Sequence, residues 1–195
     1  MSQKNAAIIA DKLTKRYGDL LAVDCISFHV DEGEIFGFLG PNGSGKTSTI
    51  RMLVGLTQPS GGRASVLGCH LPGDIYLARR YVGVVPDISN LYDELSAREN
   101  LLFMARLYGV PRSQQNSRVD RLLQDFGLYE RKEDHFATFS RGMKRALTIA
   151  AALVHEPRLL FLDEPTTGLD AAAARSLRSL ISGLREKGLT VFLTT

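Results

Sequence analysis

A glycine-rich octapeptide constrains the fold of this chain more than any other feature of its sequence. Gly40-Pro41-Asn42-Gly43-Ser44-Gly45-Lys46-Thr47 fits the pattern G-x-x-x-x-G-K-[ST] and lies between an apolar segment and an amphipathic one. Glycines let consecutive backbone N–H groups curl around phosphate oxygens, and the N-terminus of a following helix adds partial positive charge. The motif therefore predicts a buried strand, a phosphate-binding loop and a helix, in that order. The residues expected to surround the phosphates are Gly40, Pro41, Asn42, Gly43, Ser44, Gly45, Lys46, Thr47 and Ser48.

Two residues of this loop carry specific chemistry. Lys46 is expected to reach the β- and γ-phosphates of a nucleotide, and Thr47 to offer its hydroxyl to Mg²⁺. The alternative is a glycine-rich turn with a solvated lysine. The strand and helix patterns on either side of the loop argue against that alternative.

A second motif, which is acidic, follows the most hydrophobic segment of the chain, Leu159–Leu162. Ligands of α/β folds sit at the carboxyl ends of parallel strands, where Asp163 and Glu164 are expected. Asp163 is predicted to orient Mg²⁺ and its waters opposite Thr47, and Glu164 to act as general base toward an attacking water. An acidic pair that only caps a helix is the minority interpretation after a phosphate loop.

Hydrophobic patterning predicts an α/β fold with a parallel sheet, because strands alternate with helices along the chain. Ile35–Leu39 is continuously apolar, which predicts a parallel strand buried on both faces. Pro111–Ser117 is polar and is expected to join two helices. Strands are predicted within 6–30 (two strands), 63–67, 81–85, 159–162 and 190–195, and helices after the loop, over 97–108, 118–126, 140–154 and 170–187.

Composition excludes several classes of protein. With 24 Lys and Arg against 21 Asp and Glu among 195 residues, the net charge of +3 is too small for a dedicated nucleic-acid binder. We expect neither a membrane-spanning segment nor a signal peptide, because no apolar run is long enough. Cys25 and Cys69 lack metal-ligand spacing, which favours free thiols in a reducing cytosol.

From Tyr17 onward, the motifs resemble in order those of the nucleotide-binding subunit of an ABC (ATP-binding cassette) transporter. Gly40–Thr47 is similar to the family's Walker A motif, and Phe161–Glu164 to the end of Walker B with the catalytic glutamate. Ser140-Arg141-Gly142-Met143-Lys144 resembles the family signature, usually LSGGQ, and Gly168-Leu169-Asp170 resembles the D-loop.

This resemblance implies one domain over residues 1–195, incomplete at its C-terminus, with a P-loop NTPase core and a mainly parallel sheet. An N-terminal antiparallel β-subdomain is expected at about 6–30 and 61–70, and an inserted helical subdomain at about 87–140.

The resemblance also implies roles for residues outside the two nucleotide motifs. Tyr17 would stack on adenine, a contact worth roughly 1–3 kcal/mol; taken alone it is a surface tyrosine beside a turn. Ser140 and the Gly142 amide would face the γ-phosphate of ATP bound to a partner cassette, although Ser140 is equally a good helix N-cap. The signature residues expected to face that partner are Ser140, Arg141, Gly142 and Met143, with Asp170 in the D-loop.

Three features depart from the family pattern. Asp87 stands where a glutamine is usual; its carboxylate still offers a hard oxygen to Mg²⁺, so the expected metal set is Thr47, Asp87 and Asp163. Arg141 replaces the first signature glycine. The switch histidine would directly follow Thr195, so the chain is expected to be truncated there; the histidines present are His29, His70, His135 and His155.

The resemblance implies an ATPase subunit, using ATP and Mg²⁺, that powers an exporter of the ABC-2 type through ATP-driven dimerisation of two cassettes. A separate transmembrane permease would dock on Ala97–Gly109 and the Asp87 loop, and would hold the subunit on the inner face of the membrane. No nucleic-acid partner is expected. Two alternatives stay open: a nucleotide-dependent dimerisation module with little hydrolysis, and a soluble cassette ATPase outside transport.

Overall fold

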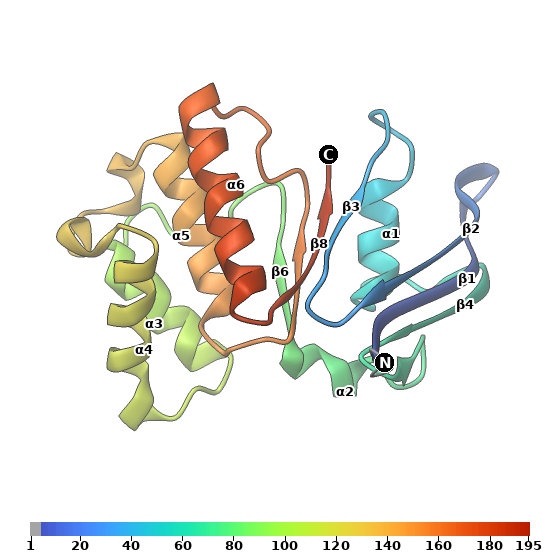
Figure 1. The fold of residues 1–195 in the computed structure, drawn as a ribbon, viewed down its shortest axis with the longest axis horizontal. Helices are drawn as coiled ribbons and strands as arrows, with labels where there is room; N and C mark the ends of the chain where they lie inside the picture. The colour runs from blue at the N-terminus through green and yellow to red at the C-terminus, as the bar shows by residue number, and fades with distance from the viewer. Residues whose placement is uncertain (1–4) are drawn as a thin grey trace.

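Two sheets of four strands organise the chain in the computed structural model, which describes residues 5–195 (Figure 1). An antiparallel sheet has the strand order β2-β1-β4-β5, and a parallel sheet has the order β3-β8-β7-β6. Their strands are β1 (Ala6–Tyr17), β2 (Leu20–Asp31), β3 (Ile35–Phe38), β4 (Gly61–Val66), β5 (Cys69–His70), β6 (Val82–Val85), β7 (Leu159–Leu162) and β8 (Thr190–Thr194). This arrangement confirms the α/β fold with a mainly parallel core and an antiparallel sheet.

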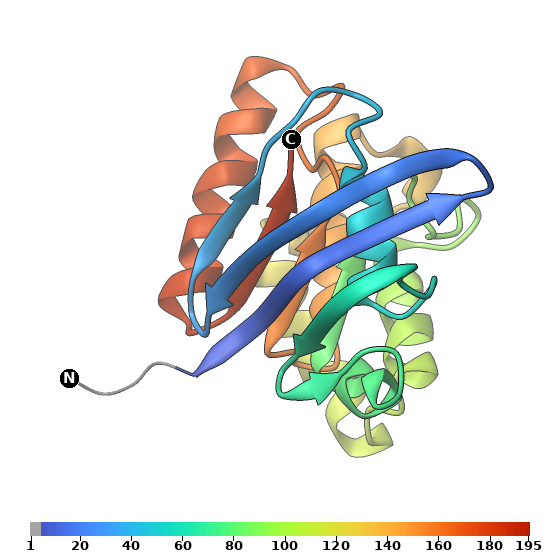
Figure 2. The same cartoon turned by 90° about the vertical axis from the view of Figure 1, so that its right-hand side faces the viewer.

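Helix α1 (Lys46–Leu53) lies between the two sheets (Figures 1 and 2). Its Met52 and Leu53 are fully buried with Ile8 and Leu13 of the antiparallel sheet and with Phe161 of the parallel sheet. The helix therefore reaches the phosphate loop from a core that both sheets share.

The opposite face of the parallel sheet packs on α5 (Arg141–Leu153) and α6 (Ala171–Glu186). Strand β7 has helices or strands on every side, and all of its side chains are buried. Burial on both faces explains why this strand is an unbroken apolar run.

The remaining helices lie along one side of α5 or beside the antiparallel sheet (Figure 1). Helices α3 and α4 share a core with α5, formed by residues such as Leu101, Leu123 and Leu147. The further helical segments are α2 (Ile75–Ala78), α3 (Ala97–Leu107), α4 (Arg112–Asp125) and three short 3-10 helices at Arg79–Tyr81, Tyr129–Arg131 and Phe136–Thr138.

Two local predictions were wrong. Strand β3 is not buried on both faces, because it lies at the edge of the described parallel sheet with β8 as its one neighbour, and its apolar side chains are half-buried. The polar stretch Pro111–Ser117 is the start of α4 and not a connection. Its helical pattern is hard to recognise because the residue that it buries is Gln115, whose amide donates to the Val110 carbonyl oxygen at 2.8 Å.

Among the described residues 5–195, no helix combines the length and the apolar character that a membrane crossing requires.

Candidate functional site

The loop between β3 and α1 has the backbone shape that its glycines allow. Gly43 and Gly45 have φ values of +83° and +88°, in the left-handed region. A Cβ atom on Gly45 would lie 2.2 Å from the Ala22 carbonyl oxygen, so this position admits only glycine. Gly45 is also the N-cap of α1 and supplies no side-chain cap, which leaves the first-turn N–H groups available to an anion.

Lys46 is almost fully buried beneath this loop, with 5% of its side chain exposed. Its Nζ donates to the carbonyl oxygens of Gly40 (2.7 Å) and Pro41 (3.2 Å) and lies 3.3 Å from Oε1 of Glu164. The ammonium group is thus fixed between the phosphate loop and the acidic end of β7.

The Asp163 carboxylate is buried and has a hydroxyl partner on each oxygen. Thr47 Oγ1 donates to Oδ2 at 2.8 Å, and Thr194 Oγ1 donates to Oδ1 at 2.7 Å. Thr194, at the end of β8, also accepts a hydrogen bond from the Glu164 N–H at 2.9 Å. Glu164 has a φ of +44°, which is unusual for a residue with a side chain and is typical of functional sites. The ends of β7 and β8 and the start of α1 therefore define one acidic centre.

Arg145 on α5 joins this centre to the segment after β6. Its guanidinium donates to the carbonyl oxygens of Pro86 (2.6 Å), Asp87 (3.3 Å), Asp163 (2.6 Å) and Pro165 (3.2 Å). Burial lowers the pKa of Arg145, while the charges of Asp87 and Asp163 raise it. The guanidinium remains charged, as arginine does throughout proteins.

A groove of about 440 Å³ brings together the phosphate loop, Asp87, the Asp163–Glu164 pair and the tyrosine at the end of β1. Tyr17 also lines this groove and is 42% exposed, and the Lys15 Nζ lies 4.9 Å from the centre of the Tyr17 ring. The exposed Asp87 lines the same groove as Thr47, Asp163 and Glu164.

The oxygen donors of the groove suit Mg²⁺. Thr47 and Asp163 offer a hydroxyl and a carboxylate in contact, and Asp87 offers a second carboxylate on the groove wall. Within residues 5–195, no three His, Cys, Asp or Glu side chains gather closely enough to hold a metal ion. Because Mg²⁺ usually binds one or two carboxylates together with substrate phosphates, this donor set fits it.

The signature-like residues lie at a second hollow of about 320 Å³, where the N-termini of α5 and α6 meet. Ser140 caps α5 by accepting from the Met143 N–H (3.3 Å), and Asp170 caps α6 by accepting from the Ala172 and Ala173 N–H groups (2.9 and 2.8 Å). Arg141 is exposed and lines this hollow as well as a groove that contains Glu164. Within one chain, Ser140 and Asp170 are therefore outside the phosphate-loop groove.

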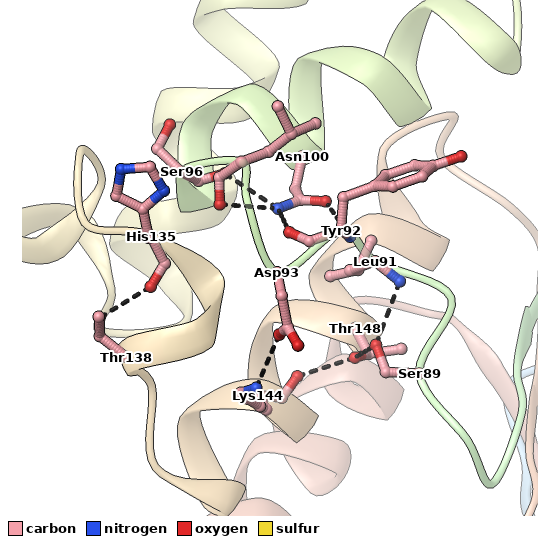
Figure 3. Close-up of polar contacts among 11 residues, drawn as sticks. Ser89, Leu91, Tyr92, Asp93, Ser96, Asn100, His135, Thr138, Lys144 and Thr148 are labelled. Carbon is pink, nitrogen blue, oxygen red and sulfur yellow. Dashed lines mark hydrogen bonds and ion pairs between the residues drawn. The ribbon is translucent and has the colours of Figure 1, made fainter.

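The segment after β6 is tied to α3 and α5 by side-chain bonds (Figure 3). Ser89 and Thr148 share a hydrogen bond of 3.0 Å, and Lys144 forms an ion pair of 2.8 Å with Asp93. The buried Asn100 donates to the carbonyl oxygens of Tyr92, Leu95 and Ser96 at 3.0 to 3.3 Å. The position of Asp87 is thus linked to that of α5.

Sequence patterns did not identify Arg145 or Thr194 as members of the site. Arg145 comes directly before the buried apolar part of α5. A cation at such a position needs a buried partner, and this requirement was the signal that could have identified Arg145. Thr194 is the last residue of the apolar strand β8, beside β7, so its polar side chain at the carboxyl end of a parallel strand was a similar signal.

Comparison with known proteins gives this geometry a family context. Residues 23–167 match the family described as "ABC transporter". The chain is 44% identical to the Nod factor export ATP-binding protein I of Paraburkholderia xenovorans, over 97% of this chain and 62% of that protein. It is 41% identical to the probable multidrug ABC transporter ATP-binding protein YbhF of Escherichia coli, over 96% of this chain and 32% of that protein.

A solved structure described as cbiO1 from Clostridium perfringens, part of the ABC transporter complex cbiONQ, has the same fold. It superposes with a TM-score of 0.89 at 28% identity, covering 98% of this chain and 79% of that chain. The chain spans 62% of the length of the curated relative from Paraburkholderia xenovorans. The match over residues 23–167 shows that the chain belongs to the ABC transporter family.

Proposed function

We propose that this chain binds ATP with Mg²⁺ and hydrolyses it as the nucleotide-binding subunit of an exporter. The observation that carries the proposal is the contact of Lys46 and Thr47 with the acidic residues after β7. Lys46 Nζ lies 3.3 Å from Glu164 Oε1, and Thr47 Oγ1 donates to Asp163 at 2.8 Å. A lysine, a hydroxyl and two carboxylates at the mouth of a phosphate loop are the groups that phosphoryl transfer requires.

The proposed roles follow from the chemistry of each group. The N–H groups of Gly40–Ser48 would hold the phosphates, Lys46 would balance their charge, and Tyr17 would stack on the base. Thr47, Asp163 and Asp87 would hold Mg²⁺, which when bound adds the positive charge that the phosphates need in the transition state. Glu164 would accept a proton from the attacking water once Lys46 turns toward the phosphates.

The wider assembly is part of the proposal. A second cassette would meet the hollow that Ser140, Arg141, Gly142 and Asp170 line, and Met143, which lines a neighbouring pocket with Ser140 and Gly142, so that ATP joins the two cassettes. A separate permease, docked near Asp87 and α3, would hold the subunit on the inner face of the membrane. Export is favoured over import because curated relatives are described by export or multidrug transport. The ABC-2 subtype is proposed from resemblance alone, namely Asp87 in place of the usual glutamine and the segments GEIFGFLGPNGSGKT and LYDELSARENL.

The alternative within the same family is a module that dimerises on ATP but turns it over slowly. The ion pair between Lys46 and Glu164 favours this alternative, since it occupies the proposed base until the lysine moves. Binding and hydrolysis therefore need separate measurements.

The test compares Lys46→Ala, Glu164→Gln and a control, Lys187→Ala, which removes an exposed ion pair with Asp125. Lys46→Ala should weaken ATP binding about tenfold or more, since a charge-assisted contact contributes about 1.5–3 kcal/mol. Glu164→Gln should keep ATP binding and lower hydrolysis about 100-fold or more. Lys187→Ala should behave as wild type.

Titration with a fluorescent ATP analogue measures binding, and phosphate release measures hydrolysis. Unchanged affinity in Lys46→Ala would reject the phosphate-loop assignment. Wild-type turnover in Glu164→Gln would reject the general base, and binding without turnover in the wild-type chain would favour the dimerisation module.

A further inference from the structure

Arg145 donates four hydrogen bonds to backbone carbonyl oxygens beside the acidic centre, and it does not line the phosphate-loop groove. Its partners are backbone carbonyl oxygens on two segments, Pro86 and Asp87 after β6, and Asp163 and Pro165 after β7. A backbone carbonyl oxygen that is shielded from water and has no hydrogen-bond donor destabilises the folded protein. One planar guanidinium supplies donors to all of them in a fixed fork.

The two segments carry the carboxylates proposed to face Mg²⁺. Strands β6 and β7 are adjacent and parallel, so their carboxyl ends lie at the same edge of the sheet. The Asp163 N–H donates to the Val85 carbonyl oxygen at 3.0 Å, which joins the two strand ends by one backbone bond. In addition to that bond, the Arg145 side chain bridges the Asp87 and Asp163 backbones.

The same residue joins this pair of segments to α5. Lys144 and Thr148, the neighbours of Arg145 on α5, bind Asp93 and Ser89 of the segment after β6 (Figure 3). Neither of these two contacts involves a residue at the end of β7. Arg145 is therefore the link between α5 and the end of β7, while Lys144 and Thr148 hold only the segment after β6.

We propose that Arg145 is a positioning residue for the divalent cation: its guanidinium fixes the backbones from which the Asp87 and Asp163 carboxylates extend. This inference rests on the proposed function, because it needs Mg²⁺ to bind with ATP at these carboxylates. The positive charge of Arg145 also offsets the charge of two nearby carboxylates, those of Asp87 and Asp163. Because Arg145 does not line the phosphate-loop groove, it would act on the cation through the aspartates.

The experiment separates cation binding from nucleotide binding. The full chain, with Arg145→Ala, Arg145→Lys or Arg118→Ala, is first titrated with a fluorescent ATP analogue in EDTA. The nucleotide complex is then titrated with Mg²⁺. Arg118 is the matched control, because this half-buried arginine also bonds a backbone carbonyl oxygen, that of Val154 at 3.4 Å, and pairs with Glu156 outside the site.

We expect all variants to bind the analogue in EDTA within about threefold of wild type, because Lys46 and the N-terminus of α1 are untouched. Arg145→Ala should need about 10- to 100-fold more Mg²⁺ for half-saturation, the usual cost of removing a group that orients a metal ligand. Arg145→Lys should give an intermediate shift, since an ammonium keeps the charge but cannot reach both segments in a fork. Arg118→Ala should match wild type.

The inference is overturned if the Mg²⁺ midpoint of Arg145→Ala stays within about twofold of wild type, or if Arg118→Ala shifts it equally. If Arg145→Ala does not fold, Arg145→Lys decides: a wild-type Mg²⁺ midpoint in that variant overturns the inference. Failure of the wild-type chain to bind the analogue at all overturns the proposed function and this inference together. A normal wild-type response with an unchanged Arg145 variant overturns this inference alone.

Discussion

At the residue scale, the Asp163 carboxylate depends on hydroxyl groups from elements far apart in the sequence. Thr47 at the start of α1 holds one oxygen, and Thr194 at the end of β8 holds the other. Thr194 is fully buried and also fixes the N–H group of Glu164. A single buried hydroxyl thus holds the Asp163 carboxylate and the Glu164 backbone, and a change that removes it should affect stability and activity together.

We predict that Thr194→Val destabilises the chain by about 2 kcal/mol, because it leaves a buried carboxylate oxygen and a backbone N–H without a partner. Hydrolysis should fall as the two acidic side chains lose their fixed orientation. Thr194→Ser is the control, since it keeps the hydroxyl and loses only a methyl group. Urea denaturation and phosphate release measure the two effects. Wild-type stability and turnover in Thr194→Val would contradict this role of Thr194.

At the element scale, the segment that follows β6 ends where α3 begins, and a capping box closes it. The Ser96 hydroxyl accepts from the Glu99 N–H at 3.2 Å, and Glu99 Oε2 accepts from the Ser96 N–H at 2.8 Å. The bonds from Ser96 lower the pKa of Glu99 from its ordinary value of 4.5. The stabilisation of the folded chain by the Glu99 carboxylate is therefore fully present above pH 4.5, and it is lost as the pH falls through the lowered pKa of the folded state.

Ser96→Ala should destabilise the chain by about 1 kcal/mol at pH 7, the usual cost of removing an N-cap hydroxyl. Ser182→Ala is its control, because Ser182 is exposed in the middle of α6 and caps nothing. The free energy of unfolding in urea provides the comparison. Equal stability of the two variants would show that the box contributes nothing to α3.

Element patterns predicted β7, α5 and α6 well because periodicity and caps are local properties. They failed for β3 and for the start of α4, where the outcome depends on neighbours. The burial of β3 depends on how many strands flank it, and the first turns of α4 are held by the Gln115 bond to Val110 and not by an apolar stripe. Neither property can be read from the segment itself.

At the scale of the whole molecule, the spacing of motifs predicted which loops gather at the carboxyl ends of the parallel strands, but not what holds these loops together. The nucleotide motifs have fixed spacing because consecutive backbone groups must surround a phosphate. Arg145 was missed because it lies 59 residues from Pro86 and 18 residues from Asp163, and only the path of the folded chain joins them. Positioning groups of this kind follow from topology, which the sequence determines only indirectly.

A second long-range contact joins the helices to the opposite end of the parallel sheet. The His155 ring, after α5, stacks on Tyr108, after α3, with ring centroids 4.0 Å apart. Its Nε2 lies 3.1 Å from the Val82 carbonyl oxygen, and its buried Nδ1 has no hydrogen-bond partner among residues 5–195. Burial lowers the pKa of His155; the bond to Val82 opposes this shift, and the nearby charge of Arg118 adds to it. Burial also raises the pKa of Tyr108, which stays neutral.

This contact predicts a loss of stability in mild acid. Below the ordinary histidine pKa of 6.5, the unfolded chain binds a proton at His155 that the folded chain does not yet bind. The free energy of unfolding should therefore fall with pH from about 6.5 down to the lowered pKa of the folded state, by up to about 1.4 kcal/mol per pH unit.

His155→Phe keeps the stacking on Tyr108 and removes the titrating group. It should be less stable than wild type at pH 7.5 but change less between pH 7.5 and 5.5. His70→Gln, at an exposed histidine of β5, is the control and should keep the wild-type slope. Urea denaturation at a series of pH values measures all three proteins. If His155→Phe keeps the full wild-type slope, the acid sensitivity originates elsewhere.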